Sequence, residues 1–513
     1  MRISNIAAAT ATVTAVMTLA SAASAATCES LRLSPRPDVT VTQATVVGAG
    51  QFSPQGPGGA VLPAAAKLPA FCRVAATLTP TRDSDIKIEV WMPAQDWNGK
   101  FLGVGNGGWA GSISYPAMAE ALGRGYAVAS TDTGHSGNGG DASFALGHPE
   151  KLIDFGYRAV HEMTAAAKTF VGAFYDAAPR FSYWNGCSTG GKQGLTEAQR
   201  FPADYDGVIA GAPANNWTRL MTGLLWAGRA TLSDPESRIP AEKFAILNRA
   251  ALNACDARDG VADGVIENPR SCRFDPQVLM CKEGDGTDCL TTAQVEAAKK
   301  IYGPATNPRT GDVLFPGLPP GSEPGWVQAA GGPAPFPIPD SHFKYVVFED
   351  PKWDFRTLDF DRDVTRAERV DNGTLTATNP DLNAFITRGG KLLMYHGWND
   401  QLITAQNSVN YYESVRSTVG AAPTDTAVRL FMAPGMTHCS GGPGPNQADW
   451  LAALEQWVER GVAPSRIVAS RSVKGVADRT RPLCAYPEVA QYSGRGSTDD
   501  AANFSCVAPD AKR

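Results

Sequence analysis

Residues 185–194 (NGCSTGGKQG) constrain the fold of this chain more than any other stretch. The aromatic run RFSYW before them is typical of a strand, and the run QGLTEAQ that leaves them is typical of a helix. The motif Gly186-x-Ser188-x-Gly190 therefore falls between a strand and a helix, where a nucleophile elbow is found. A strand that turns directly into a helix crowds its neighbours, which explains the flanking glycines. A plain glycine turn is the alternative, because the chain has 52 glycines.

Two later strand-like runs lead to the partners that such a serine needs. The run KLLMY is followed by HGWND, which ends at Asp400, and the run AVRLFMA is followed by PGMTHC, which contains His438. The order serine, aspartate, histidine is that of α/β-hydrolases. A serine hydroxyl is a weak nucleophile, so His438 would accept its proton and Asp400 would orient and stabilise the imidazole. We therefore predict a Ser188–His438–Asp400 triad on an α/β-hydrolase fold.

A cysteine lies beside the serine and another beside the histidine. Cys187 directly precedes Ser188, and Cys439 directly follows His438. If the serine and the histidine are in hydrogen-bond contact, the two cysteines are close enough to form a disulfide. Such a bridge would hold the nucleophile and the base together across a long stretch of chain.

These stretches together resemble one protein family. The motifs GCSTGG, HGxxD and GMxHCSGGPG are similar to those of the tannase and feruloyl esterase family, which includes tannases, feruloyl esterases and mono(2-hydroxyethyl) terephthalate hydrolases. The resemblance extends from Cys28 to Cys506. It implies an α/β-hydrolase with a large inserted lid, and it implies the disulfides Cys28–Cys72 and Cys187–Cys439.

The N-terminus and the cysteines predict a secreted protein, either extracellular or periplasmic. Residues 1–25 have a charged start, an apolar run and an Ala-Ser-Ala cleavage site, as in a signal peptide. No later stretch is long and apolar enough to span a bilayer. Ten cysteines in a secreted chain indicate disulfides. Local spacing favours three pairs: Cys255–Cys272, Cys281–Cys289 and Cys484–Cys506.

A glycine cluster at residues 103–111 follows an early predicted strand. In α/β-hydrolases this position supplies one oxyanion donor, and the amide after the nucleophile supplies the other. The family resemblance assigns the first donor to Gly108, and the second is then the amide of Thr189. The alternative is a flexible glycine loop with no special geometry.

The pattern of elements divides the chain into parts. Residues 26–214 read as the first part of the hydrolase core, beginning with an N-terminal extension to about residue 80. Residues 215–380 break the alternation of strands and helices and read as a lid domain. Residues 381–513 read as the second part of the core with a disulfide-tied tail. The net charge is −5 without long basic runs, which argues against nucleic acid or a polybasic membrane anchor as partners.

An acidic loop in the predicted lid indicates a structural Ca²⁺ site. Asp256, Asp259 and Asp263 cluster among glycines, the oxygen-rich setting that calcium prefers. The helix–loop–helix calcium motif fails here, because Arg258 stands where an acid is needed. The family resemblance implies ligation by these three side chains and by the carbonyls of Val261 and Val265. A solvated acidic loop without metal is the alternative.

Two other histidines stand in informative places. His396 lies on the same predicted loop as Asp400, so it is a candidate substrate contact, and the alternative is that it only packs in the interior. His161 falls within a predicted helix and reads as a surface residue or a satisfied core residue.

We predict a carboxylic-ester hydrolase that acts through an acyl-enzyme and needs no redox or organic cofactor. Its expected partner is a small aromatic ester, free or attached to plant polysaccharide or tannin. Among the substrates of the family that the chain resembles, feruloyl and other hydroxycinnamoyl esters rank first and galloyl esters second. Terephthalate half-esters rank third, because no lid arginine stands out as a carboxylate-binding residue. The alternative from another class is a non-catalytic module that binds phenolics or polysaccharide, against which the intact triad argues.

Overall fold

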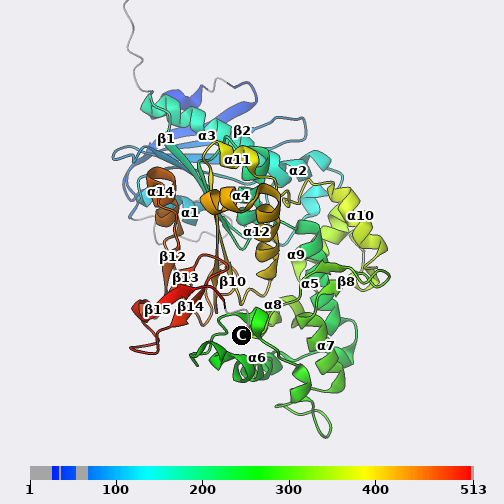
Figure 1. The fold of residues 1–513 in the computed structure, drawn as a ribbon. Coiled ribbons are helices and arrows are strands. Elements are labelled where there is room, and N and C mark those ends of the chain that lie inside the picture. Colours follow the sequence, from blue (N-terminus) through cyan, green and yellow to red (C-terminus); the bar gives the residue numbers. More distant parts are fainter. Residues whose placement is uncertain (1–25, 34–35, 54–66, 510–513) are drawn as a thin grey trace, which may run out of the picture.

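The computed structural model describes residues 26–33, 36–53 and 67–509, so the predicted signal peptide lies outside the described residues. A nine-stranded sheet forms the centre of this described part (Figure 1). Its strands, in their order across the sheet, are β1 (Val39–Val47), β2 (Phe71–Leu78), β3 (Ile86–Pro93), β5 (Ala127–Thr131), β4 (Lys100–Val104), β6 (Phe181–Cys187), β7 (Gly207–Gly211), β10 (Lys391–Gly397) and β11 (Val428–Ala433).

The type of strand pairing changes once across the sheet. The contacts from β1 to β5 are antiparallel, and those from β5 through β4 to β11 are parallel. The parallel strands are apolar along most of their length, and all five residues of β7 (GVIAG) are buried. This is expected of strands that are covered on both faces. Parallel strands also bring their carboxyl ends to one edge, where ligands bind in open α/β sheets. The predicted α/β-hydrolase fold is confirmed.

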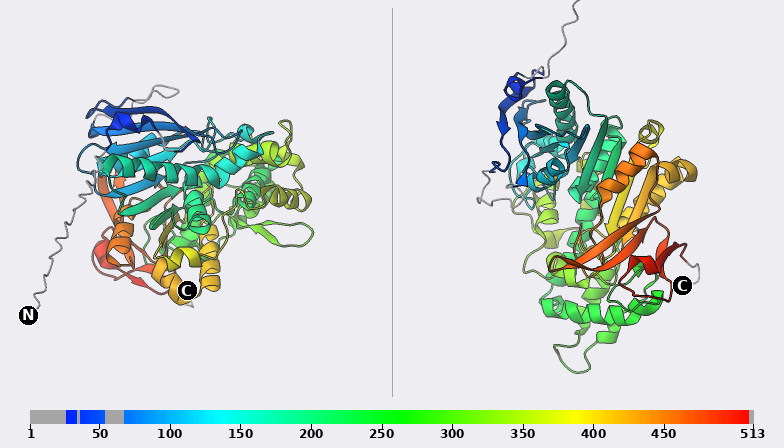
Figure 2. Two further views of the ribbon diagram at one scale, coloured as in Figure 1. Left: turned by 90° about the horizontal axis from the view of Figure 1, so that it is seen from above. Right: turned by 90° about the vertical axis from the view of Figure 1, so that its left-hand side faces the viewer.

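Helices cover both faces of the sheet (Figure 2). Successive strand residues point to opposite faces, so Val90 packs in the cluster that holds α3, α4 and α12, whereas Trp91 packs in the cluster that holds α1 and α14. The helices of the core are α1 (Tyr115–Gly123), α2 (Pro149–Ile153), α3 (Ala159–Tyr175), α4 (Thr189–Arg200), α11 (Asn383–Thr387), α12 (Gln406–Val419), α13 (Ala421–Ala427) and α14 (Trp450–Arg460).

The N-terminal region differs from the expected extension. Instead of lying outside the core, β1 and β2 are the first two strands of the central sheet. Valine and threonine alternate along much of β1 (VTVTQATVV), and both are β-branched residues that favour strands. The contrast between an apolar and a polar face is weak, however, so the sequence does not mark β1 as part of a buried sheet. Cys28 is bonded to Cys72 on β2, which ties the start of the described chain to the sheet.

A long insertion leaves the sheet after β7 and returns at β10, and the predicted lid falls within it. Figure 1 shows this insertion, mainly in green, at one end of the sheet, on the same side as the C-terminal hairpins in red. Its buried side chains fall mainly in two clusters: one around α5, which also includes Trp109 and Phe155 of the core, and another around α6 and α7. Its elements are α5 (Trp217–Leu232), α6 (Ala241–Cys255), α7 (Thr292–Tyr302), β8 (Ala305–Thr306), β9 (Val313–Phe315), α8 (Trp326–Ala330), α9 (Pro337–Ser341) and α10 (Arg362–Asp371).

The chain ends in two hairpins outside the main sheet. One pairs β12 (Arg466–Val473) with β13 (Val476–Cys484), and the other pairs β14 (Val489–Tyr492) with β15 (Phe504–Val507). Among the described residues, every helix is too short or too polar to cross a membrane.

All ten cysteines lie among the described residues and form five disulfides between the predicted partners. The Cα–Cα distances run from 5.0 to 5.9 Å, as expected for such bonds. The bonded pairs are Cys28–Cys72, Cys187–Cys439, Cys255–Cys272, Cys281–Cys289 and Cys484–Cys506.

Candidate active site

Ser188 occupies a strained turn between β6 and α4. Its backbone angles are φ 63° and ψ −122°, a region that residues with a side chain rarely adopt. Its amide donates to the carbonyl of Gly211 at 3.0 Å, and this contact holds the turn against β7. A Cβ on Gly186 would lie 2.4 Å from the carbonyl oxygen of Gly190, so only glycine fits there. The elbow predicted from G-x-S-x-G is therefore present, and the plain glycine turn is excluded.

His438 and Asp400 meet beyond the ends of β11 and β10. The Nδ1 atom of His438 lies 2.7 Å from Oδ2 of the Asp400 carboxylate. Asp400 is fully buried, and its Oδ1 accepts the amides of Leu402 and Ile403 at 2.9 Å each. These two amides fix the carboxylate, which in turn fixes the imidazole ring. Ser188 and His438 line the same pocket, so the structure brings the three predicted residues to one place.

The contact between His438 and Asp400 controls the charge of both groups. Burial lowers the pKa of His438, but the charge of Asp400 and the hydrogen bond to it outweigh burial and leave the pKa above its ordinary value. Burial raises the pKa of Asp400, yet His438 and His396 outweigh it and hold that pKa well below the ordinary range. Asp400 therefore stays ionised and favours a protonated His438.

His396 does not line the pocket, and its expected contact with substrate is corrected. Its ring is fully buried behind Asp400, with Nε2 at 3.1 Å from Oδ2 of that carboxylate and at 2.8 Å from the carbonyl of Ile403. Its Nδ1 lies 2.7 Å from the hydroxyl of Ser408 on α12. Both ring nitrogens are therefore engaged inside the protein, and His396 positions the acid.

The disulfide Cys187–Cys439 connects the two halves of the site. Its Cα atoms are 5.9 Å apart, although the two cysteines are separated by 252 residues in the sequence. One cysteine precedes Ser188 and the other follows His438. The bond thus limits how far the elbow and the histidine loop can separate.

Gly108 and Thr189 also line the pocket beside Ser188. The Thr189 hydroxyl donates to the carbonyl of Gly108 at 2.6 Å, which joins the glycine loop to the start of α4. Gly108 has φ +53°, and a Cβ there would lie 2.2 Å from the carbonyl oxygen of Gly139. The Thr189 amide lies in the first turn of α4, where backbone N–H groups have no partner within the helix. The loop has a defined geometry, in contrast to the flexible alternative.

Apolar side chains form the rest of the pocket, and most come from the insertion. Motif analysis did not identify them. The four on α5 follow the spacing i, i+3, i+4, i+7 of one helix face, a periodicity by which they can be found in the sequence. These lining residues are Ala214, Trp217, Leu220, Met221, Leu224, Phe336, Ile338, Leu402 and Ile403.

Polar contacts join the insertion to the loop that carries Asp400. The side-chain amide of Asn399 donates to the carbonyl of Gly321 at 2.7 Å. Gln401 donates to the side chain of Gln328 at 3.0 Å and accepts the amide of His438 at 3.4 Å. The insertion therefore supports the acid and base loops as well as covering the pocket.

The acidic loop of the insertion has donors that suit calcium. Asp259 and Asp263 line a small cavity together with Glu267 and Arg481. Burial raises the pKa of Asp259 to about 6, and the charges of Asp263 and Asp256 contribute to that shift. Crowded carboxylate oxygens are the ligands that Ca²⁺ prefers.

Part of this donor set is already engaged within the protein. Asp263 pairs with Arg481 at 2.5 Å, and Asp256 accepts the amide of Gly264 at 2.9 Å. Within the part of the chain that the structure describes, the ligand atoms of the three aspartates do not all lie within 4.8 Å of one another. The chemistry of the donors fits calcium, although the three carboxylates are not gathered around one point in this structure.

The comparisons with known proteins agree with one another. Residues 72–507 match the family described as tannase and feruloyl esterase. An uncharacterized esterase of Xanthomonas campestris is 41% identical over 96% of this chain and 93% of its own length. A probable feruloyl esterase B-1 of Aspergillus flavus is 35% identical over 85% of this chain and 86% of its own. The crystal structure of feruloyl esterase B from Aspergillus oryzae superposes with a TM-score of 0.87 at 32% identity and covers 94% of this chain and 99% of that chain.

Proposed function

The chain belongs to the tannase and feruloyl esterase family, and we propose that it hydrolyses carboxylic esters of aromatic acids through an acyl-enzyme. The observation that carries this proposal is the pocket that Ser188 and His438 share, with Asp400 bonded to His438 at 2.7 Å. A nucleophile, a base and an orienting acid at one site are what acyl transfer requires. A purely binding module has no need of a strained serine beside a histidine–aspartate pair.

In the acylation step, the Ser188 hydroxyl attacks the ester carbonyl while His438 accepts its proton. Asp400 stabilises the imidazolium that forms, and it stays ionised throughout. The amides of Gly108 and Thr189 would donate to the oxyanion of the tetrahedral intermediate. The intermediate collapses when His438 gives the proton to the leaving alcohol, which departs and leaves an acyl-Ser188 ester.

Deacylation repeats the sequence with water. His438 removes a proton from the water, the resulting hydroxide adds to the acyl carbonyl, and Ser188 leaves as its hydroxyl after it regains a proton from the imidazolium. The aromatic acid is then released. The apolar residues of the insertion limit access of bulk water to the pocket, which strengthens the interactions with the oxyanion.

The lining of the pocket favours a hydroxycinnamoyl group over a galloyl group. A galloyl ring carries three hydroxyls, and each hydroxyl that is buried without a partner costs roughly 1–3 kcal/mol. Leu220, Met221, Leu224 and Phe336 offer no side-chain partner for them. A feruloyl ring has one hydroxyl and one methoxy group. Among the described lining residues none is an arginine or lysine, which disfavours the carboxylate of a terephthalate half-ester.

A panel of three esters tests this order. We expect kcat/KM to be largest for methyl ferulate, smaller for methyl gallate and smallest for mono(2-hydroxyethyl) terephthalate. The Ser188→Ala variant serves as the blank for background hydrolysis. A preference for methyl gallate would reverse the assignment within the family, and no hydrolysis of any of the three would contradict aromatic ester hydrolysis itself.

We further propose that the acidic loop holds a structural Ca²⁺. Asp256, Asp259 and Asp263 would supply carboxylate oxygens, and the carbonyls of Val261 and Val265 would complete the set. The ion would neutralise the crowded charge and stabilise the insertion. Five disulfides and the predicted signal peptide support secretion of the protein into an oxidising compartment.

A further inference from the structure

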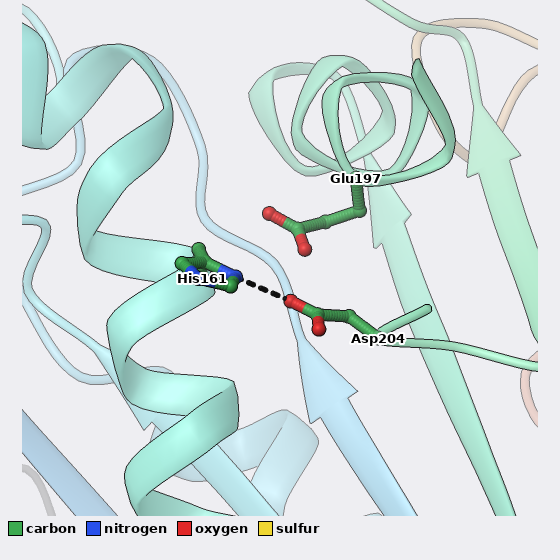
Figure 3. Close-up of side chains that lie close together, drawn as sticks. All are labelled: His161, Glu197 and Asp204. Atoms are coloured by element: carbon green, nitrogen blue, oxygen red, sulfur yellow. Dashed lines mark hydrogen bonds and ion pairs between the residues drawn. The ribbon is translucent and has the colours of Figure 1, made fainter. Parts of the chain in front are cut away.

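A second histidine–carboxylate cluster lies at the far end of α4. His161 comes from α3, Glu197 from the last turns of α4, and Asp204 from the loop that leads to β7. One ligand atom from each residue lies within 4.8 Å of the other two. Figure 3 shows the Glu197 carboxylate pointing toward the space between His161 and Asp204. Three parts of the chain thus present metal-ligating side chains to one point.

The carboxylate of Glu197 is buried and its hydrogen-bonding capacity is unsatisfied. Its side chain is 1% exposed, and within the described chain neither carboxylate oxygen has a hydrogen-bond partner. Buried carboxylates are normally paired or bound to a metal, because an isolated buried charge is costly. Burial raises the pKa of Glu197 well above its ordinary value, and the nearby charge of Asp204 adds to that shift. An external cation or a proton must therefore satisfy this group.

His161 and Asp204 provide the entrance to the cluster. The His161 Nδ1 lies 2.7 Å from Oδ2 of Asp204, and these side chains are 34% and 17% exposed. The imidazole stacks on Phe201 at a centroid distance of 3.9 Å, which fixes the plane of the ring. The partly exposed side chains of His161 and Asp204 therefore give an ion from solvent a route to the buried Glu197.

We propose that His161, Glu197 and Asp204 form a binding site for a divalent transition metal of the Zn²⁺ type. One imidazole nitrogen and two carboxylate oxygens are donors that zinc accepts, whereas calcium prefers oxygen donors alone. Tetrahedral zinc places its ligand atoms roughly 3.3 Å apart. The 2.7 Å contact between His161 and Asp204 must therefore open by about half an ångström when the ion enters. Solvent would supply a fourth ligand.

The neighbouring charges allow this ion. Lys168 donates to the backbone carbonyl of Asp204, and burial lowers its pKa below the ordinary value. The cluster thus sets two acidic side chains against one lysine whose positive charge is disfavoured by burial, so an incoming divalent cation can take the place of the proton on Glu197. The ion would tie α3 to the end of α4 and to the following loop. It would stabilise the helix whose first turn follows Ser188 without taking part in the chemistry.

A proton shared between Glu197 and Asp204 is the competing explanation, and zinc binding separates the two. The protein is stripped with EDTA, returned to excess Ca²⁺ so that the acidic loop is filled, and titrated with ZnCl₂ by calorimetry. We expect one zinc per chain and a melting temperature that rises with zinc concentration. In Glu197→Gln, which keeps the shape of the side chain, we expect the affinity to fall by more than about 100-fold, since losing even an outer-sphere partner costs ~10–100-fold.

A matched control is available at another surface histidine. His148 contacts Asp83 at 2.9 Å but is half exposed. His148→Ala should bind zinc as the wild type does. His161→Gln provides a second test at a partly exposed position in case Glu197→Gln folds poorly, and it should also lose the zinc. The proposal is overturned if the wild type binds no zinc, if both cluster variants retain it, or if His148→Ala loses it.

Discussion

A histidine–aspartate pair lies near each end of α4, and the two pairs differ in how the carboxylates around them are hydrogen-bonded. At the first turn, His438 and Asp400 are 2.7 Å apart, and at the last turns His161 and Asp204 are also 2.7 Å apart. Asp400 accepts hydrogen bonds from two histidines and two amides. The carboxylate oxygens of Glu197, the third member of the far cluster, accept no hydrogen bond from the described residues, and its nearest acidic neighbour is Asp204. A histidine–aspartate pair therefore does not define a function by itself.

The surroundings of each pair decide what it can do. Asp400 is fully satisfied and stays ionised, so it can orient a base during catalysis. Glu197 is unsatisfied, so its cluster suits a ligand that brings positive charge. We infer that the hydrogen bonds a buried carboxylate accepts distinguish the acid that orients His438 from the proposed cation site. Variants at the Ser188 end of α4 should change ester hydrolysis and leave zinc binding unaltered, and variants at the Glu197 end should do the reverse.

The largest expected effect is the loss of activity in Ser188→Ala. Removing the nucleophile should lower kcat for methyl ferulate by about 10⁶-fold, as in other enzymes of this mechanism. Zinc binding at the far end of α4 should be unchanged, because His161, Glu197 and Asp204 do not contact Ser188. Steady-state kinetics and zinc calorimetry on the same preparation check both statements. Near-normal kcat in a pure sample would refute the nucleophile.

Asp400→Asn should lower kcat by about 10⁴-fold, because the amide cannot hold the imidazole in the same tautomer. The pH dependence of kcat/KM tests the role of Asp400 independently. Asp400 raises the pKa of His438, and the base must be neutral, so activity is lost as pH falls through that raised pKa. Without the negative charge the pKa drops, and the acidic limb of kcat/KM should move to lower pH. A limb that stays in place, or moves to higher pH, would contradict the assignment.

Replacing Cys187 and Cys439 together by serine should reduce kcat by about 100-fold and change KM less. A displacement of about 1 Å between nucleophile and base is enough for such a loss, whereas the apolar substrate contacts of the insertion come from other elements that the bond does not hold. The Cys281–Cys289 pair in the insertion offers a matched control, since its replacement by serine leaves the elbow untouched. The measurements must be made well below the melting temperature of each variant. Equal losses in both double variants would indicate a general effect of disulfide removal.

The smallest effect on catalysis is expected from calcium removal. If the acidic loop holds the proposed Ca²⁺, EDTA should lower the melting temperature by removing the ion that neutralises the aspartates, while kcat measured at low temperature changes little. Adding Ca²⁺ back should restore the melting temperature that EDTA lowered. Adding Zn²⁺ should then raise the melting temperature further in the wild type but not in Glu197→Gln. No change in melting temperature with EDTA, together with no calcium by elemental analysis, would refute the calcium site.

Sequence reasoning succeeded where the signal is local. The elbow at Ser188 depends on five adjacent residues, and the local disulfides such as Cys281–Cys289 follow from short spacing. The positions of Ser188, Asp400 and His438 are also local signals, because each residue directly follows a strand that its own neighbouring residues predict. The pairing of Cys187 with Cys439 required the further step of assuming that the triad forms.

The failures come from properties that depend on the assembled fold. His396 is adjacent to the acid loop in sequence, but its burial depends on Ser408 and Ile403, which close over it from α12 and the preceding loop. His161 reads as an ordinary helix residue because its partners lie in other elements. The sequence predicts an extension where β1 and β2 lie, because threonine and alanine obscure the alternation of buried residues.

Labelling of Ser188 is the most direct test of the account. The protein is treated with an alkyl fluorophosphonate, which phosphonylates activated serines, and the adduct is located by peptide mass spectrometry. The account predicts one adduct per chain, on the peptide that contains Ser188, with loss of ester hydrolysis in proportion to labelling. Ser188→Ala should take up no label. An adduct on any other residue, or full activity in fully labelled protein, would contradict it.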